Sequence, residues 1–95
     1  MARQSELEAN EMELSTEAKS IKTRDEFVSF VESLAHDLAT NAAQWENARL
    51  GDFLEALAAW TNDMDGYYAN NQLPIPSVPT WATFAQILLA AKHYE

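Results

Sequence analysis

The side chains with the widest chemical range in this 95-residue chain are two histidines and fifteen acids, since cysteine is absent. Without cysteine there is no thiolate nucleophile and no sulfur ligand for a metal. His36 lies opposite the apolar stripe of its helix, four residues after Glu32, with which it can pair weakly. His93 is near the end of the last helix, where the helix dipole favours a proton. Neither histidine has a second histidine at metal-binding spacing, so the indication of a zinc site is weak.

The segment Asp63-Met64-Asp65-Gly66 has a faint likeness to a calcium-binding loop. With Gly66 at the sixth loop position, the first is Thr61 and the twelfth is Gln72, where a calcium loop needs acids. The two glycines form no phosphate-binding loop, and no GxSxG or HExxH pattern occurs. We therefore expect no catalytic residues, no metal, no cofactor and no enzymatic activity.

Charge is the most informative bulk property, because the net charge is -9. Residues 1–24 hold four bases and five acids, whereas residues 25–95 hold two bases and ten acids. The surface formed by residues 25–95 should therefore be strongly negative. It should repel nucleic acid and anionic membranes and attract a cationic protein. The alternative is that the charge serves only to keep the protein in solution.

The cellular location of the protein is predicted from three features that the sequence lacks: cysteines, a signal peptide and a membrane-spanning segment. Small secreted domains usually carry disulfides, so a chain without cysteine suits a reducing cytosol. Residues 1–8 are rich in glutamate and contain no apolar signal-peptide core. The apolar runs are too short to span a bilayer. We expect a soluble, cytoplasmic protein.

The elements that position these residues are helices, predicted near 24–42, 48–69 and 80–93. Thr23 and Glu26 form a capping box ahead of apolar residues at helical spacing. Asn47 is expected to cap the second helix and Thr80 the third. The third helix has no charged residue from Trp81 to Ala91, so it is either central in the bundle or in contact with another protein. The predicted fold class is all-α, a small bundle of three to four helices.

A proline-containing linker, residues 70–79, precedes the last helix and should pack along the core through Leu73, Ile75 and Val78. Residues 5–20 are prone to form a helix, with a thin apolar stripe of Leu7, Leu14, Ala18 and Ile21. This segment could be a docked helix, a helical arm or a frayed tail. We divide the chain into an N-terminal arm or tail, 1–22, and a single helical domain, 23–95.

The core is expected to contain the three tryptophans and three phenylalanines, Trp45, Trp60, Trp81, Phe27, Phe53 and Phe84. Asp65 falls inside the apolar sector of its helix, beside Leu54 and Ala58. A buried carboxylate needs hydrogen bonds, and the indole N–H of Trp81 or Trp45 is a suitable donor. The alternative is that Asp65 anchors a lysine or arginine of a partner.

Acids and aromatic residues gather on and next to the second helix. Its outer face has Asp52, Glu55 and Asp63, with Tyr67 at one edge, a mixture that suits a protein-binding surface. The alternative is an ordinary solvated face. The predicted partner-binding residues are Glu46, Asp52, Glu55, Asp63, Asp65, Tyr67 and Tyr68.

The runs Trp45-Glu46-Asn47, Phe53-Leu54-Glu55-Ala56-Leu57 and Asp63-Met64-Asp65-Gly66-Tyr67-Tyr68 form a signature that continues through the linker to Tyr94-Glu95. Over residues 24–95 the chain resembles a family of small uncharacterised bacterial helical proteins. That resemblance implies a helical fold and brings no assigned chemistry.

By type the chain is also similar to the immunity proteins of bacterial toxin systems, including contact-dependent growth inhibition, which are small, acidic, helical and free of cysteine. This likeness implies a cytosolic inhibitor that binds and neutralises a toxin domain, often a basic nuclease. Two other hypotheses stay open: a self-associating regulatory or structural helical module, and a binder of a small ligand or metal. The sequence leaves the partner and the oligomeric state undetermined.

Overall fold

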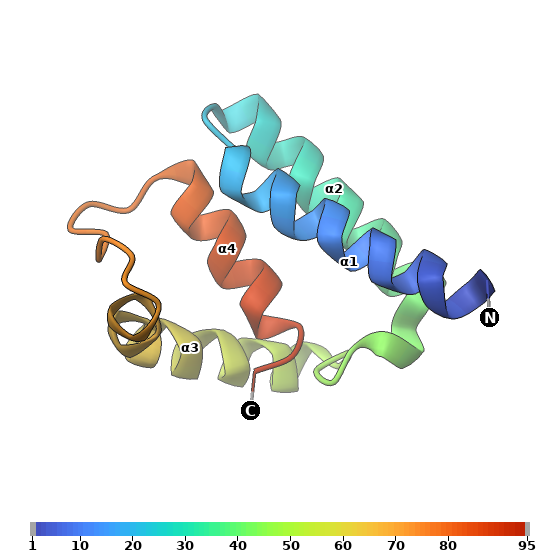
Figure 1. Ribbon diagram of the computed structural model, residues 1–95. Helices are drawn as coiled ribbons and strands as arrows, with labels where there is room; N and C mark the ends of the chain where they lie inside the picture. Colours follow the sequence, from blue (N-terminus) through green and yellow to red (C-terminus); the bar gives the residue numbers. More distant parts are fainter. Residues whose placement is uncertain (1, 95) are drawn as a thin grey trace.

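The computed structural model describes the backbone of residues 2–94 and the side chains of residues 9–94. Within this part the chain forms α-helices and no strands (Figure 1). The helices are α1 (Ala2–Ser20), α2 (Arg24–Asn41), α3 (Leu50–Asn70) and α4 (Trp81–Ala91), with a 3₁₀ turn at Ala42–Gln44. The predicted all-α bundle with a proline-containing segment before the last helix is confirmed. No helix among these residues is long and apolar enough to cross a membrane.

Two helices begin at the threonines that the sequence indicates. The Thr23 hydroxyl accepts a hydrogen bond from the Glu26 amide, and the Glu26 carboxylate accepts one from the Thr23 amide, both at 3.1 Å. Thr80 and Thr83 make the same reciprocal pair at the start of α4, again at 3.1 Å. Each pair satisfies amides that have no partner inside the helix, which fixes the first residue of α2 and of α4.

The expected cap of α3 is wrong. Arg49 is the N-cap residue and makes no side-chain capping bond. The Asn47 amide donates instead to the carbonyls of Ala91, at 3.0 Å, and Tyr94, at 2.7 Å. Because these carbonyls belong to the end of α4, Asn47 ties the loop before α3 to the far end of the chain.

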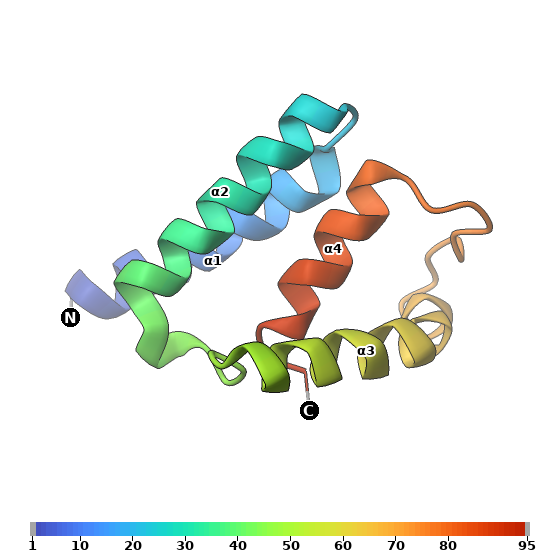
Figure 2. The same cartoon turned by 180° about the vertical axis from the view of Figure 1, so that it is seen from behind.

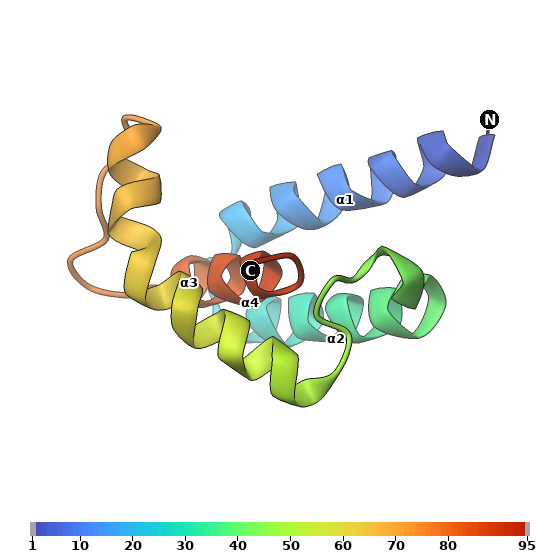
Figure 3. The ribbon, with the colours of Figure 1, turned by 90° about the horizontal axis from the view of Figure 1, so that it is seen from below.

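The helices are arranged around α4. Helices α1 and α2 lie side by side, and α4 packs against both of them and against α3 (Figures 1 and 3). Among the described helices, α3 contacts α4 alone. Of the two alternatives for the uncharged last helix, the central position is therefore the observed one.

Helix α1 is docked on the bundle. Leu14, Ala18 and Ile21 of its apolar stripe are buried in the core cluster, together with Phe30, Leu34, Trp45 and Ala85. The side chain of Leu7, the fourth residue of the predicted stripe, lies outside the described side chains. Of the three alternatives for the N-terminal segment, the structure has the docked helix.

Fewer aromatic side chains are buried in the core than the sequence predicts. Trp45 is buried as predicted, but Trp81 is 39% exposed and Phe84 is 44% exposed. Trp60, Phe27 and Phe53 are only partly buried. The reason is that Trp81 and Phe84 lie in the first turn of α4 and line an open pocket with Ile21, Lys22 and Pro79, which leaves part of both rings in contact with water.

The linker does not pack along the core. Leu73, Ile75 and Val78 are all exposed, contrary to the prediction. The chain leaves α3 through Gln72, whose φ of 58° lies in the left-handed region, and then follows an outer arc to α4 (Figures 1 and 2). This turn directs the segment away from the body of the protein, so its apolar side chains meet water.

Candidate functional site

The five acids predicted to bind a partner are all exposed: Glu46, Asp52, Glu55, Asp63 and Asp65. They lie in the loop before α3 and along α3 itself. A helix turns by about 100° per residue, so Asp63 and Asp65 point roughly 200° apart. Asp52, Glu55 and Asp63 therefore share the outer face of α3 that the sequence predicts, whereas Asp65 points away from them, so the five acids do not form one compact face.

The expected burial of Asp65 is wrong. Its side chain is exposed and has no indole partner among the described residues. Asp65 lies on the side of α3 that also carries Leu54, which is itself 53% exposed. That side has no neighbouring helix, because α3 touches only α4 within the described chain. An apolar sector read from one helix is buried only where another helix covers it.

The predicted tyrosines belong to an aromatic cluster between α3 and the end of the chain. The Trp60 ring lies 5.0 Å from Tyr67 and 5.4 Å from Tyr94, between ring centroids. Tyr67 is 40% exposed, whereas Tyr68 is buried, so only Tyr67 offers substantial ring surface to a partner. The Tyr94 hydroxyl donates to Asp63 at 2.6 Å, which raises the pKa of Tyr94.

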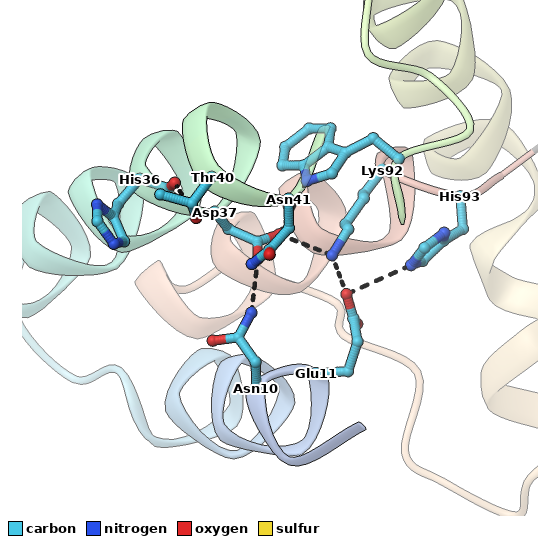
Figure 4. A network of polar contacts seen from close by, with 9 residues as sticks. Asn10, Glu11, His36, Asp37, Thr40, Asn41, Lys92 and His93 are labelled. Carbon is cyan, nitrogen blue, oxygen red and sulfur yellow. Dashed lines mark hydrogen bonds and ion pairs between the residues drawn. The ribbon is translucent and has the colours of Figure 1, made fainter. Parts of the chain in front are cut away.

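Among the described side chains the buried acid is Asp37, on α2, which was not among the residues predicted from the sequence. One carboxylate oxygen accepts hydrogen bonds from the amides of Asn10 and Asn41. The other accepts from the Trp45 indole at 2.8 Å and from the Lys92 ammonium at 2.7 Å. Figure 4 shows these groups converging between α1, α2 and the end of α4. We call these five residues, with Glu11, the polar junction.

Lys92 is the cation of the polar junction and is 1% exposed. Its ammonium contacts the carboxylates of Asp37 and Glu11 and lies 5.4 Å from the centre of the Trp45 ring. Burial lowers the pKa of Lys92, because the charged form loses its hydration. The pKa of the neighbouring His93 is also lowered, by burial and then by the Lys92 charge.

The buried carboxylate at the centre of the polar junction has no free bonding capacity for a ligand or substrate. A carboxylate offers about four acceptor positions, and Asp37 uses all of them within the chain. No buried polar side-chain atom lacks a partner among the described residues. Nor do three histidines or acids gather there in a way that could hold a metal ion. The arrangement joins α1, α2 and α4 and is structural.

A signal for Asp37 is present in the sequence. It follows Leu34 by three residues and Phe30 by seven, so it falls on the apolar stripe of α2. Lys92 likewise follows Ala91 at the end of the uncharged helix. The rule applied to Asp65 would have flagged Asp37, but its partner Lys92 is 55 residues away and cannot be identified from local spacing.

The acids of α3 form no ion pair with a base among the described side chains. All ion pairs among the described side chains join Lys92 or His93 to Asp37 or Glu11. Asp52, Glu55 and Asp65 are exposed and take part in none of them. Their negative charge is therefore directed to the surroundings, and the single base next to them is the exposed Arg49 at the start of α3.

Comparison with known proteins places the chain in a family. Residues 23–95 match the model of DUF7660, a family of unknown function, and the chain belongs to that family. No curated protein and no solved structure matched the chain. The match begins at the N-cap of α2, so it includes Asp37, Trp45 and Lys92 but excludes Asn10 and Glu11 of α1.

Proposed function

We propose that this DUF7660 protein is a non-catalytic binding module for a cationic protein, and that the partner is a bacterial toxin domain which it neutralises. One observation carries the proposal: the exposed acids on and before α3 form no ion pair with any base whose side chain the structure describes. A net charge of -9 accompanies them. Such a surface is complementary to a protein that itself binds nucleic acid.

The polar junction supports the non-catalytic part of the proposal. Asp37 and Lys92, the charged pair with the least exposure, bind each other and their neighbours in the chain. An acid or base in catalysis needs a free position from which to exchange a proton with a substrate. The exposed acids are spread around a helix, which suits a contact surface better than a shared catalytic centre.

The mechanism is electrostatic capture followed by occlusion. Acidic side chains around α3 attract the basic groove of the toxin, and close pairs with its lysines and arginines then hold the complex. The protein occupies the position of the phosphates and excludes the nucleic acid. Because the attracting charges are exposed, the association rate should fall steeply as salt is added.

The test is co-expression of this chain with the toxin domain encoded beside its gene. Wild-type protein should restore growth and co-elute with the toxin domain on gel filtration. The double reversal Asp52→Lys, Glu55→Lys should lose both, since both acids are exposed and free of internal ion pairs.

The matched control is Glu13→Lys, Glu32→Lys, which changes the net charge by the same amount through two exposed acids on α1 and α2. It should retain most of the binding. Equal loss in both variants would mean that only the overall charge matters and no α3 surface is used. Failure of the wild type to bind or to restore growth would overturn the toxin proposal.

A further inference from the structure

A groove with almost entirely apolar walls lies between α2 and α3. Val31 and Leu38 of α2 form one wall, and Leu50 and Phe53 of α3 form the other, with Leu88 of α4 between them. Trp45 lies where the walls approach each other. The cavity measures about 260 Å³. Figure 2 shows α2 and α3 diverging on the two sides of α4.

Next to this cavity, α3 and α4 carry further exposed apolar side chains. Leu54 follows Leu50 by one turn of α3 and is 53% exposed, and Leu50 itself is 73% exposed. On α4, Phe84 precedes Leu88 by one turn and is 44% exposed. Apolar side chains gathered in one strip, as opposed to scattered singly, mark a surface that another molecule covers.

The shape of the groove suits a helix. Helices α2 and α3 both pack on α4 but not on each other, which leaves one position of a helical bundle open. Side chains of an incoming helix at i, i+3, i+4 and i+7 would fit between the apolar rows of α2 and α3. No described segment of the chain occupies this position.

The negative charge around the groove favours a cationic molecule as its occupant. Residues 24–91, which include all of its walls, contain nine acids and two bases. Glu55, one residue after Leu54, is exposed and free of ion pairs. A second copy of this chain would bring the same negative charge to the contact and be repelled. A helix with lysine and arginine beside its apolar face is attracted.

We propose that this groove binds an amphipathic helix of the cationic partner, with the apolar face of that helix on Leu50, Leu54 and Leu88 and its basic flanks on the acids of α3. The inference rests on the proposed function and adds the anchoring site. The negative charge on α3 speeds the association of the partner helix and orients it. Burial of the leucines supplies most of the affinity of the complex.

The probe is a synthetic 18-residue peptide of leucine and lysine, with leucine at helical three–four spacing. Two peptides control for it: one with the same composition and scrambled order, and one with glutamate in place of lysine. Wild-type protein should bind the first peptide at least about tenfold more tightly than either control, since both apolar register and positive charge contribute.

The variant Leu50→Gln, Leu54→Gln tests the groove without altering charge, and should weaken binding of the leucine–lysine peptide by about tenfold or more. The matched control Ile75→Gln, Val78→Gln changes two exposed apolar residues of the linker, away from the groove, and should bind as the wild type does. Circular dichroism before and after thermal unfolding checks that both variants fold.

The outcomes separate the two proposals. If Asp52→Lys, Glu55→Lys weakens binding but Leu50→Gln, Leu54→Gln does not, the groove inference is overturned and the acidic-surface proposal survives. Equal binding of the glutamate peptide overturns the choice of a cationic occupant. If the free protein self-associates and this self-association disappears in Leu50→Gln, Leu54→Gln, the choice of a cationic occupant is overturned too. That result would show that a second copy of the chain occupies the groove. No binding by the wild type overturns the inference, while growth rescue by the toxin pair would still stand.

Discussion

On one side of α2, Asp37 is 2% exposed and accepts four hydrogen bonds from its own chain. On the other side, Val31 faces a groove whose walls, Leu50 above all, are open to water. The usual distribution of charged and apolar residues is thus reversed in both places. The polar junction is a completed contact between α1, α2 and α4, whereas the groove leaves apolar side chains open to water, and we propose that a partner helix covers them.

The difference teaches how to separate structural from functional residues in a protein of this size. A buried charge is tolerated when the chain supplies every hydrogen bond, and such a group has nothing left for a ligand. An exposed apolar strip has the opposite property, since its interactions are unfilled in the free protein. Removing residues from the first region should cost stability, and removing them from the second should cost binding.

The largest effect should come from Asp37→Ala, which leaves the Lys92 ammonium and the Trp45 indole without a main partner. Breaking one side of a buried pair costs about 3–5 kcal/mol. Urea unfolding followed by circular dichroism measures it. Asp52→Ala, at an exposed acid, is the control and should change stability by less than about 0.5 kcal/mol. A loss below about 1 kcal/mol for Asp37→Ala would mean that the junction is not structural.

Two phenylalanines give the next comparison. Phe30 is fully buried in the core cluster, and Phe30→Ala should cost about 3–5 kcal/mol. Phe84 is 44% exposed on the groove side of α4, so Phe84→Ala should cost roughly half as much or less. Both values come from the same urea titration, with unchanged slope as the check on two-state unfolding. Equal losses would show that the Phe84 side of α4 belongs to the core.

The polar junction should also make stability depend on pH through His93. Burial and the Lys92 charge lower its pKa in the folded protein, against the opposing charges of Glu46 and Asp37. The unfolded chain therefore binds the proton more readily. Stability is fully present above the ordinary imidazole pKa of about 6.5 and falls as the pH drops through that value.

Melting temperatures of wild type and His93→Gln, measured from about pH 8 to pH 5, test this. The melting temperature of the wild type should fall relative to that of His93→Gln as the pH is lowered. An opposite slope would mean that the Glu11 carboxylate, 3.5 Å from Nε2 of His93, dominates.

The smallest effect should come from the groove. Leu54→Gln should change the free energy of unfolding by no more than about 0.5 kcal/mol, because Leu54 mostly meets water in the free protein. Leu34→Ala, on the buried face of α2, should cost about 2–5 kcal/mol in the same measurement. A loss above about 1 kcal/mol for Leu54→Gln would mean that the groove is closed in solution by the chain itself.

Much of the fold was accessible from the sequence because helix formation and capping are local. The Thr23–Glu26 box and the threonine before Trp81 each use groups three residues apart, so the starts of α2 and α4 were predicted correctly. The uncharged run from Trp81 to Ala91 also gave a central position as one of two alternatives for this helix, and the structure has that one. The exposure of Asp52, Glu55 and Asp63 followed from their spacing relative to the apolar stripe of α3.

Which polar and apolar groups are buried was decided only by the tertiary structure. The sequence marks both Asp37 and Asp65 as acids within an apolar sector, and it marks Trp45 and Trp81 alike as core candidates. Asp37 and Trp45 are buried because α1 and the end of α4 close over them. Asp65 is exposed because no described helix covers its side of α3, and Trp81 is exposed because it lines an open pocket at the start of α4. Periodicity gives the direction of a side chain from its own helix, but burial depends on whether a distant segment covers that side.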